Sequence, residues 1–80
     1  MHELGITQDV VTTVSDAANG RRVVKVTLAI GALAGVEADA IRFCFDVVAK
    51  GTALEGAVVE VVALAGAEML IQTVEVEEAS

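Results

Sequence analysis

Residues 22–30 read RVVKVTLAI, and this stretch decides the fold. Its side chains divide between two faces. Val24, Val26, Leu28 and Ile30 fall on one face, and Val23, Lys25, Thr27 and Ala29 fall on the other. This two-residue period is typical of a half-buried strand. Because a strand of this length needs partner strands or a covering helix, the neighbouring segments must supply them.

The segments on either side of this strand predict two helices. Residues 4–18 carry apolar side chains at three- and four-residue spacing and end at Asn19-Gly20, residue types that tolerate a positive φ beyond a helix. After the strand, two glycines within residues 31–35 predict a turn. A second helix then begins near Glu37 and ends at Gly51. Its apolar stripe consists of Ile41, Phe45 and Val48, widened by Ala40, Cys44 and Val47.

The remaining residues predict two more strands. Residues 57–64, AVVEVVAL, are apolar on both faces, and residues 69–78, MLIQTVEVEE, follow a short loop. We expect these two strands to pair as a hairpin whose acidic end discourages edge-to-edge association. The order helix-strand-helix-strand-strand predicts a single α/β (α+β) domain over residues 1–80. Its three-stranded sheet carries both helices on one face.

The sheet face away from the helices has more apolar residues than a monomer should expose. Val58, Val62 and Leu64 fall on it, together with either Met69 and Ile71 or Leu70. A contiguous exposed apolar patch marks an interface. We therefore expect a homodimer, or another partner, on this outer sheet face.

Composition excludes several classes of function. A net charge of −7 repels phosphate, and Phe43 and Phe45 are the only aromatic residues, so we expect no nucleic-acid partner. The absence of a long apolar run and of a signal-peptide pattern predicts a cytoplasmic protein without a membrane partner. Ser15 has no nearby histidine, Cys44 lies in an apolar helical stretch, and the glycines form no phosphate loop. We therefore expect no enzymatic activity.

The first four residues, MHEL, place the only histidine directly after Met1. The amine of an N-terminal Met1, the amide nitrogen of His2 and its imidazole can close fused chelate rings around one metal ion. Such planar nitrogen donors suit Ni(II) or Cu(II). A fourth donor is needed. It can come from the backbone nitrogen of Glu3, from the Glu3 carboxylate or from a group of a partner. On chemistry alone, a frayed chain end that tolerates any polar residue is the simpler interpretation.

Longer stretches carry a family resemblance. The opening MHELGI, residues 23–61 and the strand MLIQTVEVE resemble the HypA/HybF family of hydrogenase nickel-incorporation proteins. The motifs that are most specific to this family are IGALAGVE (residues 30–37), the RF pair (residues 42–43) in the following helix, and GTALEGA (residues 51–57). The resemblance covers nearly the whole chain, and its pieces occur in order.

This resemblance implies a nickel metallochaperone for the maturation of [NiFe]-hydrogenase, although another nickel enzyme such as urease is also open. It implies the GTPase HypB and the hydrogenase large subunit as partners. The nickel-binding assignment falls on His2, with backbone groups of Met1 and Glu3 and with the Glu3 side chain left open. Gly5 stands where serine is common. The alternative is a metal-free adaptor or dimerising scaffold that has lost nickel delivery.

Members of this family carry a zinc domain with two CxxC pairs between the last two strands. That domain would lie between about residues 64 and 69, where the chain reads only ALAGAE. A structural zinc tetrathiolate needs four cysteines, and Cys44 is the only one. We therefore expect Ni(II) without structural zinc. The chain looks like the nickel-binding module alone, either as a paralogue lacking the insertion or as a form from which it was removed.

Overall fold

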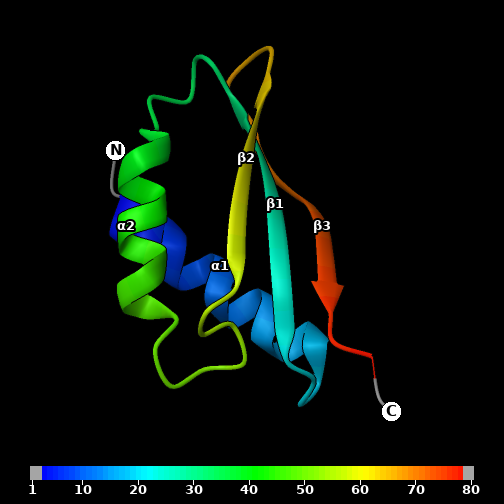
Figure 1. The fold of residues 1–80 in the computed structure, drawn as a ribbon. Coiled ribbons are helices and arrows are strands. Elements are labelled where there is room, and N and C mark those ends of the chain that lie inside the picture. Colours follow the sequence, from blue (N-terminus) through cyan, green and yellow to red (C-terminus); the bar gives the residue numbers. More distant parts are fainter. Residues whose placement is uncertain (1–2, 79–80) are drawn as a thin grey trace.

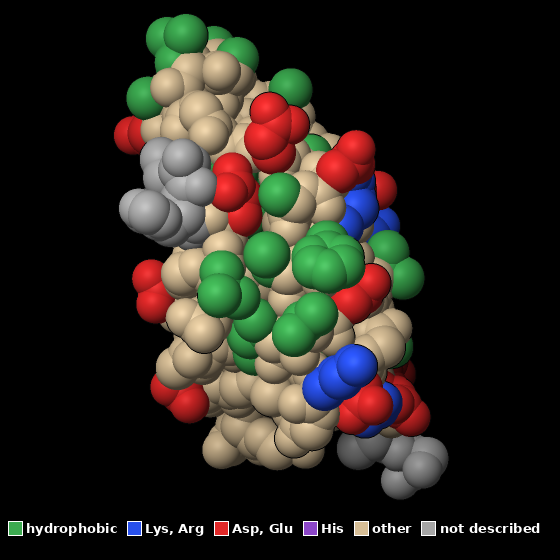
Figure 2. Space-filling view, turned by 90° about the vertical axis from the view of Figure 1, so that its left-hand side faces the viewer, with side chains coloured by type: hydrophobic (Ala, Val, Ile, Leu, Met, Phe, Trp, Pro, Cys, Tyr) green, Lys and Arg blue, Asp and Glu red, His purple; other side chains and the backbone are tan. Residues whose placement is uncertain are grey.

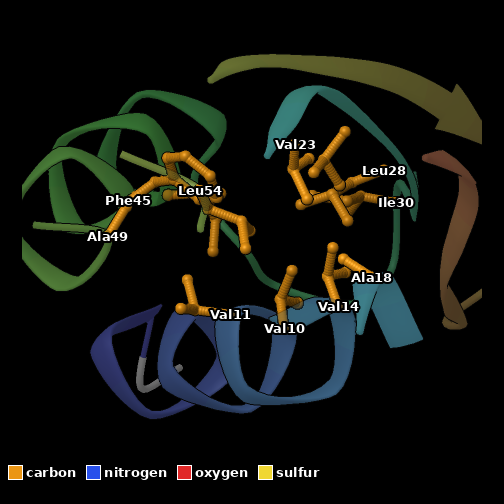
Figure 3. Packing of buried hydrophobic residues seen from close by; sticks show 12 residues of the cluster. Val10, Val11, Val14, Ala18, Val23, Leu28, Ile30, Phe45, Ala49 and Leu54 are labelled. Carbon is orange, nitrogen blue, oxygen red and sulfur yellow. The ribbon is translucent and has the colours of Figure 1, made fainter. Parts of the chain in front are cut away.

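A computed structural model describes residues 3–78 and shows a three-stranded sheet with two helices (Figure 1). The elements are helix α1 (Glu3–Ala18), strand β1 (Val23–Gly31), helix α2 (Ala38–Val48), strand β2 (Val58–Leu64) and strand β3 (Met69–Val76). The predicted element order and the α+β class are confirmed. Both helices pack against the same face of the sheet (Figures 1 and 3).

The strand order corrects one prediction. The sheet runs β2-β1-β3, with β2 parallel and β3 antiparallel to β1. The predicted hairpin between β2 and β3 is therefore wrong, because β1 lies between them. The physical reason is burial, since the central position pairs both edges of the most apolar strand, the helices cover one of its faces, and side chains of β2 and β3 flank the other. From Val26 to Gly31, every residue of β1 is buried.

The short connection between β2 and β3 crosses over the end of β1. Residues 65–68 make this crossing, which must span about 10 Å because neighbouring strands lie about 4.8 Å apart. The Gly31 amide donates to the Glu68 carbonyl at 2.7 Å, and the Leu33 amide donates to the Gly66 carbonyl at 2.8 Å. These bonds fasten the crossing at the place where the resemblance implies a zinc domain.

The core lies between the sheet and the two helices (Figure 3). Valines of α1 point toward apolar side chains of β1 on one side and toward α2 and the following loop on the other. Each buried Leu, Ile, Val or Phe side chain contributes about 1.5–3 kcal/mol. The cluster consists of Val10, Val11, Val14, Ala18, Val23, Val26, Leu28, Ile30, Ile41, Phe45, Ala49 and Leu54.

Two face assignments change in the structure. The register of β1 against β3 shifts between Val23 and Lys25, so that Val24 is an extra residue in a bulge. A bulge reverses the alternation beyond it. Val24 is accordingly 45% exposed, and Val23 takes the predicted place beside Val26 in the core. In α2, Val47 lies on the exposed side rather than at the margin of the buried stripe.

The outer sheet face carries Val58, Val62, Leu64 and Leu70. The register pairs Ala29 of β1 with Val62 on one side and with Leu70 on the other. Directly paired residues share a face, so Leu70 rather than Met69 and Ile71 belongs to this surface. Met69 instead packs against the core. Val58 and Leu70 are about half exposed on this face, but the ion pair between Lys25 and Glu60 also lies on it and interrupts the apolar surface.

Candidate metal centre at the start of helix α1

The predicted metal centre lies at the N-terminal end of α1. Met1 and His2 lie outside the described residues, and Glu3 is the first residue of the helix. The hydroxyl of Thr7 donates a hydrogen bond of 2.7 Å to the Glu3 carbonyl. This bond lies within α1 and satisfies the hydroxyl of Thr7, whose side chain is fully buried. Of the three residues predicted to bind the metal, only Glu3 lies within the described residues.

The Glu3 side chain bridges the two helices. Its Oε2 accepts a hydrogen bond of 3.1 Å from the backbone amide of Glu37. Glu37 is the N-cap of α2, and its own side chain makes no capping hydrogen bond. Amide groups and the dipole at a helix start favour a negative charge. The Glu3 carboxylate therefore stabilises the start of α2 and holds the starts of both helices together.

The glycine at position 5 leaves this arrangement intact. A Cβ atom added at Gly5 would meet no atom within 4 Å. The serine that is common at this position in the resembling family would therefore fit without moving a neighbour. The departure affects the intrinsic helix propensity of the first turn rather than its packing.

The described residues contain no second candidate for a metal centre. Within residues 3–78, no three His, Cys, Asp or Glu side chains gather closely enough to hold a metal ion. Cys44 is a free, half-buried thiol on α2.

An apolar surface covers the outward side of α2. Figure 2 shows hydrophobic side chains gathered in the middle of this face, with acidic side chains around them. Phe43 is 72% exposed, and Val47 and Leu4 are each at least half exposed. The exposure of Phe43 was not predicted from the sequence. Its position outside the buried stripe of Ile41 and Phe45 could have indicated this exposure. This surface is a candidate for partner contact.

Comparison with known proteins assigns the family. Residues 1–69 match the family described as "Hydrogenase/urease nickel incorporation, metallochaperone, hypA". The chain belongs to the HypA family. The "Hydrogenase maturation factor HypA" of Rippkaea orientalis is 52% identical over 66 residues, covering 82% of this chain and 58% of that protein. The protein of the same name from Geobacter metallireducens is 56% identical over 57 residues, covering 71% of this chain and 52% of that protein.

The extent of the match matters for function. It includes residues 1 and 2 and ends at Met69, so most of β3 lies outside it. The chain spans only a little over half the length of these HypA relatives. The family is described as one of nickel-incorporation metallochaperones, and the matching relatives are named as hydrogenase maturation factors. Among residues 3–78, no helix is long and apolar enough to cross a membrane.

Proposed function

We propose that this chain is a nickel carrier, which binds Ni(II) at its N-terminus for the maturation of [NiFe]-hydrogenase. The observation that carries this proposal is the match to a nickel-incorporation family, because it starts at residue 1 and so includes Met1 and His2. In the proposed site, the Met1 amine, the His2 amide nitrogen and the His2 imidazole bind the metal in one plane. Nitrogen donors in one plane suit Ni(II), which prefers square-planar coordination by such donors.

Glu3 most simply provides a nickel ligand through its backbone nitrogen rather than through its carboxylate. Its carboxylate already accepts the hydrogen bond from Glu37, so metal binding by this side chain would compete with a contact between the helices. The same contact gives the preceding segment a fixed base.

The proposal includes delivery to partners in the cytoplasm. The GTPase HypB and the hydrogenase large subunit are the partners that the family resemblance implies. A zinc tetrathiolate is not part of the proposal, because Cys44 is the only cysteine. The apolar side of α2, on which Phe43 is 72% exposed, is the candidate surface for contact with these partners.

A metal-free adaptor or dimerising scaffold is the second candidate. The observation that favours it is the apolar outer sheet face, on which Val58 and Leu70 are exposed. An adaptor needs such a surface and needs no metal. The two candidates differ in whether the isolated protein binds nickel.

Titration of the untagged protein with Ni(II) tests the proposal. We expect one bound ion per chain, with the visible absorption band of planar Ni(II). Both His2→Ala and a Gly-Ser extension before Met1 should abolish this binding. Asp9→Ala, an exposed change on the same helix, is the matched control and should leave it unchanged. Binding that survives both N-terminal changes would overturn the site, and no binding by the parent protein would favour the adaptor.

A further inference from the structure

Strand β3 lies at the edge of the sheet with incompletely covered side chains. Its inner residues Ile71 and Val74 are 36% and 37% exposed. Their partners on β1, Leu28 and Val26, are at most 1% exposed. The helices therefore cover β1 fully but the inner side of β3 only in part, since Met69 and Val76 at its ends pack against the core while Ile71 and Val74 between them stay exposed. In the described part of the chain, β3 pairs only with β1, and no strand lies beyond it (Figure 1).

A groove separates this edge from α1. It has a volume of about 310 Å³, and its walls are mainly apolar. A strand added to the outer edge of β3 would extend the sheet above α1, and every second side chain would point into the groove. The groove is lined by Ile6, Asp9, Val10, Thr13, Met69, Leu70 and Ile71.

The two segments that line this edge, α1 and residues 68–78, carry a net negative charge, although Lys25 of β1 pairs with Glu75 and the Arg22 carbonyl accepts a hydrogen bond from the Glu77 amide. Seven of the twelve acidic residues lie within residues 3–18 and 68–78, and these two segments contain none of the five Lys and Arg residues. Asp9 lines the groove itself, and Glu75 lies on β3. An extended segment that carries Lys or Arg complements this field.

Two features disfavour a second copy of the chain at the same edge. Parallel pairing of β3 with β3 would bring Glu75 and the following acidic residues of both copies together, and like charges across a strand pair are destabilising, so this feature acts against a parallel pair. The register shift between Thr27 and Leu28 also leaves one extra residue in β3. Such a bulge interrupts a long edge and limits pairing to a short segment.

We propose that the outer edge of β3 binds a short, extended segment of another protein in which apolar residues alternate with Lys or Arg. The segment adds a strand to the sheet, its apolar side chains enter the groove beside Ile71, and its cations face Asp9 and the acidic end of β3. This binding function goes beyond nickel binding and does not depend on it.

A synthetic peptide tests the inference with a defined probe. The probe is a nine-residue peptide of alternating lysine and valine, and its control has the same composition with all lysines before all valines. We expect the alternating peptide to bind about tenfold or more tightly than the control, because only alternation separates the two faces of a strand. Backbone amide shifts and slowed hydrogen exchange should appear in β3 and along the groove side of α1.

Protein variants separate groove binding from general charge attraction. Asp9→Lys should weaken the alternating peptide about five- to tenfold, whereas Asp16→Lys, an exposed change on the same helix outside the groove, should have a smaller effect. Ile71→Ser should weaken binding, whereas Val58→Ser on β2 should not. Circular dichroism checks that each variant is folded.

Several outcomes would overturn the inference. These are equal binding of both peptides, amide shifts confined to α2 or β2, equal effects of Asp9→Lys and Asp16→Lys, or no binding at millimolar peptide. A dimer that the peptide dissociates would show that a second copy occupies the edge. None of these outcomes bears on the nickel titration, so the two proposals can fail separately.

Discussion

The carbonyl of Gly66 lies directly against the α-carbon of Gly31. A Cβ atom built at Gly31 would stand 2.3 Å from the Gly66 oxygen and 2.7 Å from its carbonyl carbon. Both atoms belong to the backbone of the crossing between β2 and β3, which hydrogen bonds from the amides of Gly31 and Leu33 hold in place. The absence of a side chain at residue 31 thus allows such a short crossing.

Replacing Gly31 should therefore destabilise the fold. Gly31→Ala forces two backbone segments apart, and we expect a loss of about 3 kcal/mol in the free energy of unfolding, at the upper end of overpacking effects. Urea denaturation followed by circular dichroism measures this loss. A loss below about 0.5 kcal/mol, the range of ordinary surface substitutions, would show that the crossing is loose.

Gly5 offers the opposite case. An added Cβ there meets no atom within 4 Å, and the residue lies in the first turns of α1. Gly5→Ala should stabilise the protein by up to about 1 kcal/mol through helix propensity, and Gly5→Ser by less. The same urea denaturation measures both changes. If either variant destabilised the protein, the added side chain would have to meet an atom, which would contradict the open space around position 5.

The contrast between these glycines shows what the sequence could predict. Helices and strands follow from local periodicity, and all five elements lie close to their expected positions. Strand pairing does not follow from it, because a short loop indicates a hairpin unless something forces a crossing. The signal was present in β1, whose residues from Val26 onward are apolar or small on both faces, as befits a central strand.

The candidate site shows the same limit. The position of His2 after Met1 is a property of the sequence alone and could be recognised there. The hydrogen bond from Glu37 to Glu3 joins residues 34 positions apart and exists only because the two helices start side by side. Sequence reasoning left the Glu3 carboxylate open as a ligand, and only the tertiary structure provides it with another role.

Substitutions at Glu3 test that role. Glu3→Ala removes the acceptor for the Glu37 amide and should cost about 1 kcal/mol in the free energy of unfolding. Glu3→Gln keeps an oxygen acceptor, so it should cost less. If the backbone of Glu3 rather than its carboxylate is the nickel ligand, the Glu3→Gln variant should also retain nickel binding. Loss of nickel binding in a folded Glu3→Gln variant would instead assign the carboxylate as a ligand.

Nickel affinity should depend steeply on pH. The proposed donors bind only when deprotonated, and reference pKa values are about 6.5 for imidazole and 7.7–8.0 for an N-terminal amine. Protons therefore compete increasingly as pH falls from about 8 to 6, and we expect at least about a hundredfold loss of affinity. Calorimetric titrations at several pH values measure it. A constant affinity over this range would exclude the amine and the imidazole as donors.

Self-association through the outer sheet face remains a prediction, and sedimentation can test it. Val58 is 59% exposed on this face, and burial of such side chains drives association. We expect the mass to rise from monomer toward dimer with concentration and Val58→Glu to abolish this rise by placing a charge in the interface. Phe43→Glu changes an equally apolar, 72% exposed residue on α2 and is the matched control. A monomer at tens of micromolar, or an equal effect of both variants, would remove the outer face as a dimer interface.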